Sequence, residues 1–327
     1  MTFTRFGLLA GLALALITPA IGTTARAQDY PSKQITLLVP VAPGGALDIT
    51  VRALAPILQR HIGQPVLVAN KTGAAGAVGV QSVVVSAADG YTVLVATTLM
   101  SLIPAVDKVF GRAPTFSRED FIPVALLSAE PVLLFVRSEQ PWKTLDDLAA
   151  EVKKRDGALV FSSSGIYGPT HIPIEMWLKA VNLKMRHLPT TGGGPAMTAA
   201  LGGNSDLVAA YPSVGGPHAK AGKLRALAAT GAKRHPDFPD VPTFKELGFD
   251  IEYYPWIGLF FTKSVPEPII KTFGEAVKKA VADPEYAQAM VRINSGIEYM
   301  DREAFTAFFK KDSDRLESVV KAIGKVE

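Results

Sequence analysis

The feature that most constrains the fold is the segment at residues 37–52, LLVPVAPGGALDITVR, in which an apolar run stops at a pair of glycines. The run before the glycines has the composition of a buried parallel strand. After Gly44 and Gly45, apolar residues recur at helical spacing and predict a helix with one buried face. A strand that enters a helix through a tight turn is the repeating unit of an α/β fold.

This turn also has a chemical consequence. It leaves several backbone N–H groups unpaired at the start of a helix, where the helix dipole is positive. One interpretation is a site that holds a carboxylate or phosphate by backbone groups rather than by an arginine. The other is a turn that needs glycine only for its geometry, and the segment alone does not separate the two.

Two further strands are predicted at residues 66–69 and 91–96, with a helix between them that follows the small-residue segment 70–79. This alternation predicts a parallel sheet, and ligands of such sheets gather at the carboxyl ends of the strands. Thr97 and Thr98 lie at such an end, as does the glycine turn, which favours the binding interpretation. The glycines of segment 70–79 do not match the dinucleotide fingerprint and are interpreted as positions of close helix packing.

A second α/β set follows. A strand at 158–161 leads through a loop rich in serine and threonine, 162–171, into a helix at 172–181. Capping needs one hydroxyl rather than four, so this loop is interpreted as a second ligand contact. The turn at 190–194 has three glycines before another helix and is predicted to form a backbone concavity.

Two crossings between domains are predicted. The segment 121–137 is almost continuously apolar with a break at Glu130-Pro131, and the aromatic segment 251–261 runs back. A chain of this length is expected to form two domains. The predicted lobes are residues 28–128 with 252–327, and residues 129–251, with the two crossover strands as the hinge. Later helices are predicted at 243–247, 268–281 and 303–323.

The N-terminus and the composition limit compartment and chemistry. Residues 1–27 combine a positive charge, a short apolar run and the cleavage motif Ala25-Arg26-Ala27, which predicts a signal peptide and a periplasmic protein. A retained membrane anchor is the competing interpretation.

The absence of cysteine excludes disulfides and thiol nucleophiles, and the five histidines show no metal-ligand spacing, so no metal or cofactor is expected. The formal net charge is +4 without clustered Lys and Arg, so nucleic-acid binding is not supported.

Six short motifs follow one another along the chain. They are YPSKQI at 30–35, PVAPGGALD at 40–48, NKTGAAG at 70–76, DFIPV at 120–124, GKLRALA at 222–228 and DVPTFKELG at 240–248. In these motifs the chain resembles the periplasmic solute-binding proteins of the tripartite tricarboxylate transporters, the TctC or Bug (Bordetella uptake gene) family. The motifs cover nearly the whole mature chain, and the set is specific where a single motif would be weak.

The resemblance implies a two-lobed type II periplasmic-binding-protein fold, in which each lobe is a mixed, mainly parallel sheet flanked by helices. It implies a monomer that is not an enzyme, captures a small carboxylate between its lobes and delivers it to the permease subunits of a membrane transporter. The ligand residues that the resemblance implies are Ala42, Gly44, Gly45, Asp48, Thr97, Thr98, Ser163, Gly165, Thr170 and His171. Thr191 and Gly192 are added at a departure from the family: where the family commonly has an aromatic residue before the glycine pair, this chain has Thr190-Thr191-Gly192, and the loss of the aromatic is expected to enlarge or polarise the pocket.

Alternatives remain open at this stage. Asp48 lies in the first turn of a helix, so it is interpreted either as a loop-orienting group or as an acceptor for a ligand hydroxyl or amine. A hydrolase that uses Ser163 or Ser164 with His171 is the enzyme alternative, but the chain lacks G-x-S-x-G. A sensor that presents the carboxylate to a membrane histidine kinase would use the same closing motion. The loop Ile166-Tyr167-Gly168 departs from the shorter version that is common in the family.

Overall fold

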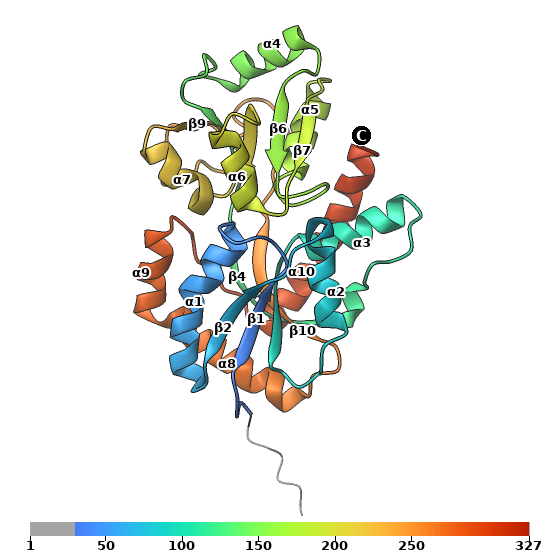
Figure 1. Ribbon diagram of the computed structural model, residues 1–327, viewed down its shortest axis with the longest axis vertical. Coiled ribbons are helices and arrows are strands. Elements are labelled where there is room, and N and C mark those ends of the chain that lie inside the picture. The colour runs from blue at the N-terminus through green and yellow to red at the C-terminus, as the bar shows by residue number, and fades with distance from the viewer. Residues whose placement is uncertain (1–29, 327) are drawn as a thin grey trace, which may run out of the picture.

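Two lobes share the chain in the computed structural model, which describes residues 30–326 (Figure 1). Each lobe is built on one five-stranded sheet. The predicted signal peptide, residues 1–27, lies outside the described residues. Within residues 30–326, no helix is both long and apolar enough to span a bilayer.

Lobe 1 is the lobe whose sheet has the strand order β2-β1-β3-β10-β4. β1 pairs in parallel with β2 and β3, whereas β10 is antiparallel to β3 and β4, so the sheet is mixed. Ile35, Leu37 and Val39 of β1 are completely buried, which confirms the apolar strand predicted before the glycine turn. The strands are β1 (Ile35–Val39), β2 (Val66–Asn70), β3 (Thr92–Thr97), β4 (Phe121–Ala129) and β10 (Trp256–Thr262).

Helices cover both faces of this sheet (Figure 1). They are α1 (Ala46–Ile62), α2 (Ala77–Val84), α3 (Leu99–Val109), α8 (Glu267–Ala282), α9 (Pro284–Arg292) and α10 (Arg302–Ile323), with the 3-10 helices η1 (Ala74–Gly76) and η2 (Arg118–Asp120). α1 buries Leu47, Val51 and Leu54, as its spacing predicts. A Cβ on Gly79 of α2 would lie 2.6 Å from the Cα of Pro40, so this glycine permits the close packing that was predicted.

Two helices of lobe 1 were not predicted from the sequence. α3 contains Pro104 in its interior, which usually argues against a helix. α9 is separated from α8 only by Asp283, whose side chain accepts from the Glu285 N–H and caps the new helix. Both helices therefore form in spite of local signals that read as breaks.

Lobe 2 has the strand order β7-β6-β8-β5-β9. β6 is parallel to β7 and β8, and β5 is antiparallel to β8 and β9. Its elements are β5 (Leu133–Arg137), α4 (Leu145–Arg155), β6 (Val160–Ser163), α5 (Ile172–Ala180), β7 (Arg186–Pro189), α6 (Gly193–Leu201), β8 (Leu207–Ala210), α7 (Pro212–Lys220) and β9 (Leu224–Ala229).

The helix predicted at 243–247 is wrong. The N–H of Ala229, at the end of β9, bonds the Pro242 carbonyl, and the Phe244 N–H bonds back to the Ala229 carbonyl. These bonds hold the segment extended along β9. Only a single turn remains, closed by the Leu247 N–H on the Thr243 carbonyl at 3.1 Å.

The chain passes between the lobes twice, from β4 to β5 and from β9 to β10 (Figure 1). The two crossings lie side by side, because the Glu130 N–H of the first bonds the Pro255 carbonyl of the second at 3.3 Å. Glu130 is buried there, and burial raises its pKa to about 7 although Gly296 and Ser295 donate hydrogen bonds to it. A buried carboxyl without a cation partner thus lies where the lobes join.

Candidate ligand-binding site

A cavity of about 30 Å³ lies where the two lobes meet. Lobe 1 lines it with the starts of α1 and α3, and lobe 2 lines it with residues around the starts of α5, α6 and α7. No lining side chain is charged. The lining residues are Val41, Gly45, Ala46, Leu47, Ala75, Thr97, Leu99, Ser164, Pro169, Thr170, Gly193, Ala210, Tyr211 and Val214.

The five helix starts around this cavity share one property. None of α1, α3, α5, α6 and α7 has a side-chain hydrogen bond at its N-cap. Their N-cap positions hold Gly45, Thr98, His171, Gly192 and Tyr211. First-turn N–H groups and positive dipole ends are suited to an anion. α5 supplies only its dipole, because Ile172 donates to the Gly168 carbonyl, residue 173 is proline and Ile174 donates to the His171 carbonyl.

Asp48 organises the glycine turn. Its carboxylate accepts hydrogen bonds from the Gly44 N–H at 3.0 Å, from Arg52 and from Asn70. Burial alone would raise the pKa of Asp48, but the hydrogen bonds from Arg52, Gly44 and Asn70 outweigh burial and hold the pKa below its usual value. Asp48 is therefore an ionised acceptor that is already satisfied, and its geometry favours the loop-orienting interpretation. The Gly44 N–H is bound to Asp48 and not directed to the cavity.

The glycine-rich turns of the two lobes touch each other. The Ala42 N–H donates to the Thr191 carbonyl at 2.9 Å. A Cβ on Gly192 would lie 2.9 Å from the Ala42 nitrogen, and a Cβ on Gly194 would lie 2.5 Å from the Pro43 carbonyl oxygen. The lobes are therefore closed, and the concavity predicted at 190–194 is filled by the turn of lobe 1.

Two threonine–tyrosine pairs lie behind the cavity. Thr97 shares a hydrogen bond of 3.3 Å with the hydroxyl of Tyr211 in lobe 2, and both residues line the cavity. Thr98 bonds Tyr253 of the second crossing at 3.2 Å and is completely buried outside the lining. Tyr211 was missed from the sequence, although its place directly after β8 is the strand-end signal that singled out Thr97.

The serine-rich loop of lobe 2 contributes through Ser164 and Thr170. The Thr170 hydroxyl accepts from the Ser164 N–H at 2.9 Å and donates to the Ser164 hydroxyl at 3.0 Å, which leaves the Ser164 O–H able to donate into the cavity. Ser163 bonds His187 at 2.7 Å and does not line the cavity. Gly165 packs against Ala75 of lobe 1, where an added Cβ would approach to 2.8 Å.

His171 holds the serine-rich loop through a hydrogen bond to its backbone. It is completely buried, and its Nδ1 accepts from the Tyr167 N–H at 3.2 Å. Its Nε2 lies 3.3 Å from Glu175 but without hydrogen-bond geometry. Its ring lies 4.2 Å from the ring of His187, whose pKa is lowered to about 3 by burial and then by repulsion from His171. Ser163 therefore bonds a different histidine from the one expected in the hydrolase alternative.

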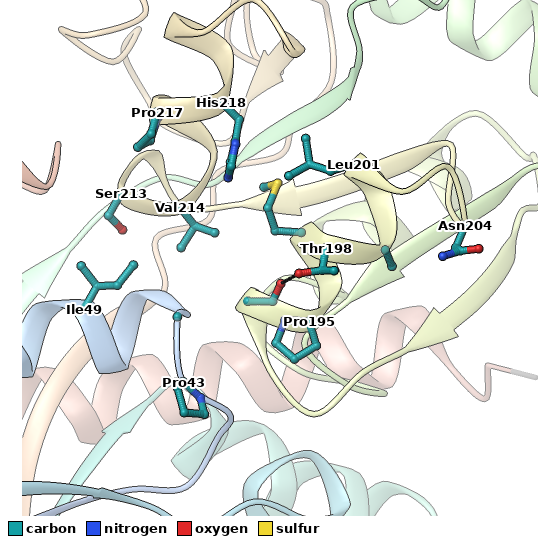
Figure 2. Close-up of a pocket in the computed structure, with 14 residues that line it drawn as sticks. Pro43, Ile49, Pro195, Thr198, Leu201, Asn204, Ser213, Val214, Pro217 and His218 are labelled. Atoms are coloured by element: carbon teal, nitrogen blue, oxygen red, sulfur yellow. Dashed lines mark hydrogen bonds between the residues drawn. The ribbon is translucent and has the colours of Figure 1, made fainter.

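A larger hollow of about 880 Å³ flanks the cavity on the side of α1, α6 and α7. Figure 2 shows Pro43 and Ile49 of lobe 1 facing Pro195 and Val214 of lobe 2 across it. Val214 lines both this hollow and the inner cavity, so the two adjoin at that residue.

The fold and this interlobe site define a periplasmic-binding-protein architecture. The solved structure of the periplasmic binding protein BugD superimposes with a TM-score of 0.85, is 28% identical, and the match covers 90% of this chain and 99% of BugD. MatC from Rhodopseudomonas palustris, solved with bound malate, is 25% identical with a TM-score of 0.81 over 89% of this chain and 99% of MatC.

The family model of the tripartite tricarboxylate transporter family receptor, TctC, matches residues 50–325. BugT of Bordetella pertussis is 32% identical over 300 residues, which are 88% of each chain. The chain belongs to the TctC receptor family, as the motifs predicted. It is a solute-binding receptor and not an enzyme.

Proposed function

We propose that this receptor captures a small carboxylate between its lobes and delivers it to the membrane subunits of a tripartite tricarboxylate-type transporter. The family supports the transporter as the partner, and the malate in MatC supports a carboxylate as the cargo. The predicted signal peptide supports the periplasm as the compartment, because it exports the chain to the side from which such a transporter takes its substrate.

The meeting of five uncapped helix starts around an uncharged cavity is the observation that carries the carboxylate. A carboxylate that leaves water needs donors for its oxygens, because burial without partners is costly. The first N–H groups of α1, α3 and α6 and the hydroxyl of Ser164 supply such donors. Arg52 does not, because it is half exposed and bound to Asp48 and Asn70.

In this proposal, closure of the lobes links binding of the carboxylate to recognition by the membrane subunits. Residues 42–45 and 191–194 meet through backbone contacts, so closure brings surfaces of both lobes into one fixed arrangement. A membrane subunit that binds this arrangement selects the closed receptor. Because the cargo lies between the lobes, it can favour closure only by contacting both of them.

A paired thermal-shift screen tests the cargo class. The mature chain, residues 28–327, is stripped of ligand by partial unfolding and refolding and then mixed with malate, succinate, butyrate and benzoate. The neutral amide of each acid is the matched control. An acid at 100 times its dissociation constant should stabilise the fold by about 2.7 kcal/mol, whereas its amide should not.

Two results would contradict the carboxylate. One is a folded protein that no acid stabilises, and the other is equal stabilisation by acid and amide. The transporter is tested separately: reconstituted membrane subunits should accumulate the identified acid only when this receptor is added.

A further inference from the structure

The C-terminal tail joins the two lobes outside the ligand cavity. After α10 of lobe 1, the chain at residues 324–326 reaches the loop 163–171 of lobe 2. The Tyr167 hydroxyl donates to the Gly324 carbonyl at 2.8 Å and accepts from the Val326 N–H at 2.9 Å. Lys179 on α5 also donates to the Ala322 carbonyl. Tyr167 therefore uses both hydrogen-bonding capacities of its hydroxyl on the tail.

The ring, the hydroxyl and the backbone of Tyr167 all make fixing contacts. Its side chain is buried, and its ring centre lies 5.7 Å from that of Phe110 in lobe 1 and 5.7 Å from that of His171. Its backbone has a φ of 53°, in the left-handed region that is uncommon for residues other than glycine. Such a conformation persists only where the surroundings fix it. The ring, the hydroxyl and the His171 bond to its N–H supply that fixation.

The anchored residue lies in the middle of a loop that forms the cavity wall. Ser164 precedes Tyr167 and Thr170 follows it, and both line the cavity. Tyr167 also lines a groove of about 560 Å³ together with Ala75, Lys325 and Val326. Ala75 belongs to groove and cavity alike, so the tail forms a wall of the groove beside the cargo site.

We propose that Tyr167 is a positioning residue: by binding the C-terminal tail, it orders the loop 163–171 and ties lobe 2 to lobe 1 in the closed arrangement. This gives the loop that departs from the common family pattern a physical role. Its importance for cargo rests on the proposed function, whereas the ordering of the loop does not.

Hydrogen exchange of the mature chain tests the ordering without any ligand. Tyr167→Phe removes the hydroxyl and keeps the ring, and a truncation after Ile323 removes its partners. Tyr30→Phe is the matched control, because the Tyr30 hydroxyl donates to the Gly90 carbonyl at the same 2.8 Å but within lobe 1. We expect amides of 163–171 to exchange about fivefold faster in Tyr167→Phe and at their usual rate in Tyr30→Phe.

A double variant shows whether Tyr167 acts through the tail. Truncation combined with Tyr167→Phe should exchange no faster than truncation alone, because both remove the same bonds. Unchanged exchange at 163–171 in both single variants would overturn the proposal. Equal acceleration over the whole of lobe 1 would also overturn it, since that outcome describes a general loss of stability.

Malate binding gives a second readout. If malate binds the wild type, Tyr167→Phe should speed its dissociation about fivefold, because the bonds between Tyr167 and the tail hold the lobes closed over the cargo. Equal dissociation rates would overturn the role in cargo retention. If neither malate nor another acid of the screen binds, the proposed function fails while the exchange experiment still decides the anchor.

Discussion

Helices that start at the cleft differ from helices that start away from it. Thr144, Asp283 and Asp301 cap α4, α9 and α10 through side-chain oxygens that accept first-turn N–H groups. The five helices around the cavity have no such bond. α2, which begins after Gly76, and α8, which begins after Pro266, are also uncapped, although neither helix lines the cavity.

This difference shows where the chain forgoes stability. A side-chain cap contributes about 1 kcal/mol. At the cleft the chain places glycine, His171 and Tyr211 in cap positions, where no side chain accepts from the first turn. Under the proposed function the cargo is the cap, so the helix ends that look least complete are those that bind.

Gly45→Asp tests this comparison with the largest expected effect. Gly45 has φ of −87°, which aspartate adopts freely, and its Cβ would point toward the Gly193 nitrogen at 3.2 Å. The new carboxylate would cap α1 from within and repel the cargo, so carboxylate binding should weaken by about 100-fold or more. Calorimetry measures the affinity. Thr144→Asp, which adds the same charge to an outward helix start, should bind normally, and retained affinity in folded Gly45→Asp would remove this turn from the site.

Glu130, which does not line the cavity, should make the free energy of unfolding depend on pH. Its pKa is about 7 in the folded protein and 4.5 for an exposed glutamate, so the native carboxyl keeps a proton that the unfolded chain releases. Stability from this group is complete below pH 4.5 and is lost as the pH rises through 7, a change of roughly 3 kcal/mol. Urea unfolding of the wild type and of Glu130→Gln is measured from pH 4 to 8. The difference between their free energies of unfolding reports Glu130 alone, because all other groups titrate in both proteins. A constant difference between the two curves would contradict the assignment.

Gly194→Ala should block closure, with a smaller effect. The added Cβ would lie 2.5 Å from the Pro43 carbonyl oxygen, whereas a Cβ on Gly274 of α8, which does not line the cavity, would come no closer than 3.9 Å to Val124. We expect about tenfold weaker binding for Gly194→Ala and little change for Gly274→Ala. Small-angle scattering should show a more open Gly194→Ala. Equal affinities in the two variants would mean that the turns need not touch for capture.

Thr144→Ala has the smallest expected effect. Loss of the outward cap of α4 should lower the free energy of unfolding by about 1 kcal/mol and leave the affinity unchanged. Urea unfolding and calorimetry measure the two quantities. A change in affinity would show that the outward helix starts also influence the cleft.

Local pattern was sufficient for much of the fold. The apolar run before Gly44 and the helical spacing after Gly45 specified β1 and α1, because burial of one strand and one helix face is written in consecutive residues. The break at Glu130-Pro131 separated β4 from β5 in the same way. α3 was missed, because packing of its apolar face outweighs its internal Pro104.

The sequence predicted which loops reach the site, but not which hydrogen bonds their side chains make. Strand ends and helix starts placed Gly45, Thr97 and Thr170 at the cavity, since topology alone brings those ends together. The sequence could not show that Asp48 binds the Gly44 N–H, or that Ser163 turns away to His187. Such pairings depend on which side chains meet after two lobes pack, and residues far apart in the chain meet only in the tertiary structure. The tail of α10 reaching Tyr167 is decided at that level for the same reason: its two partners are 157 and 159 residues away.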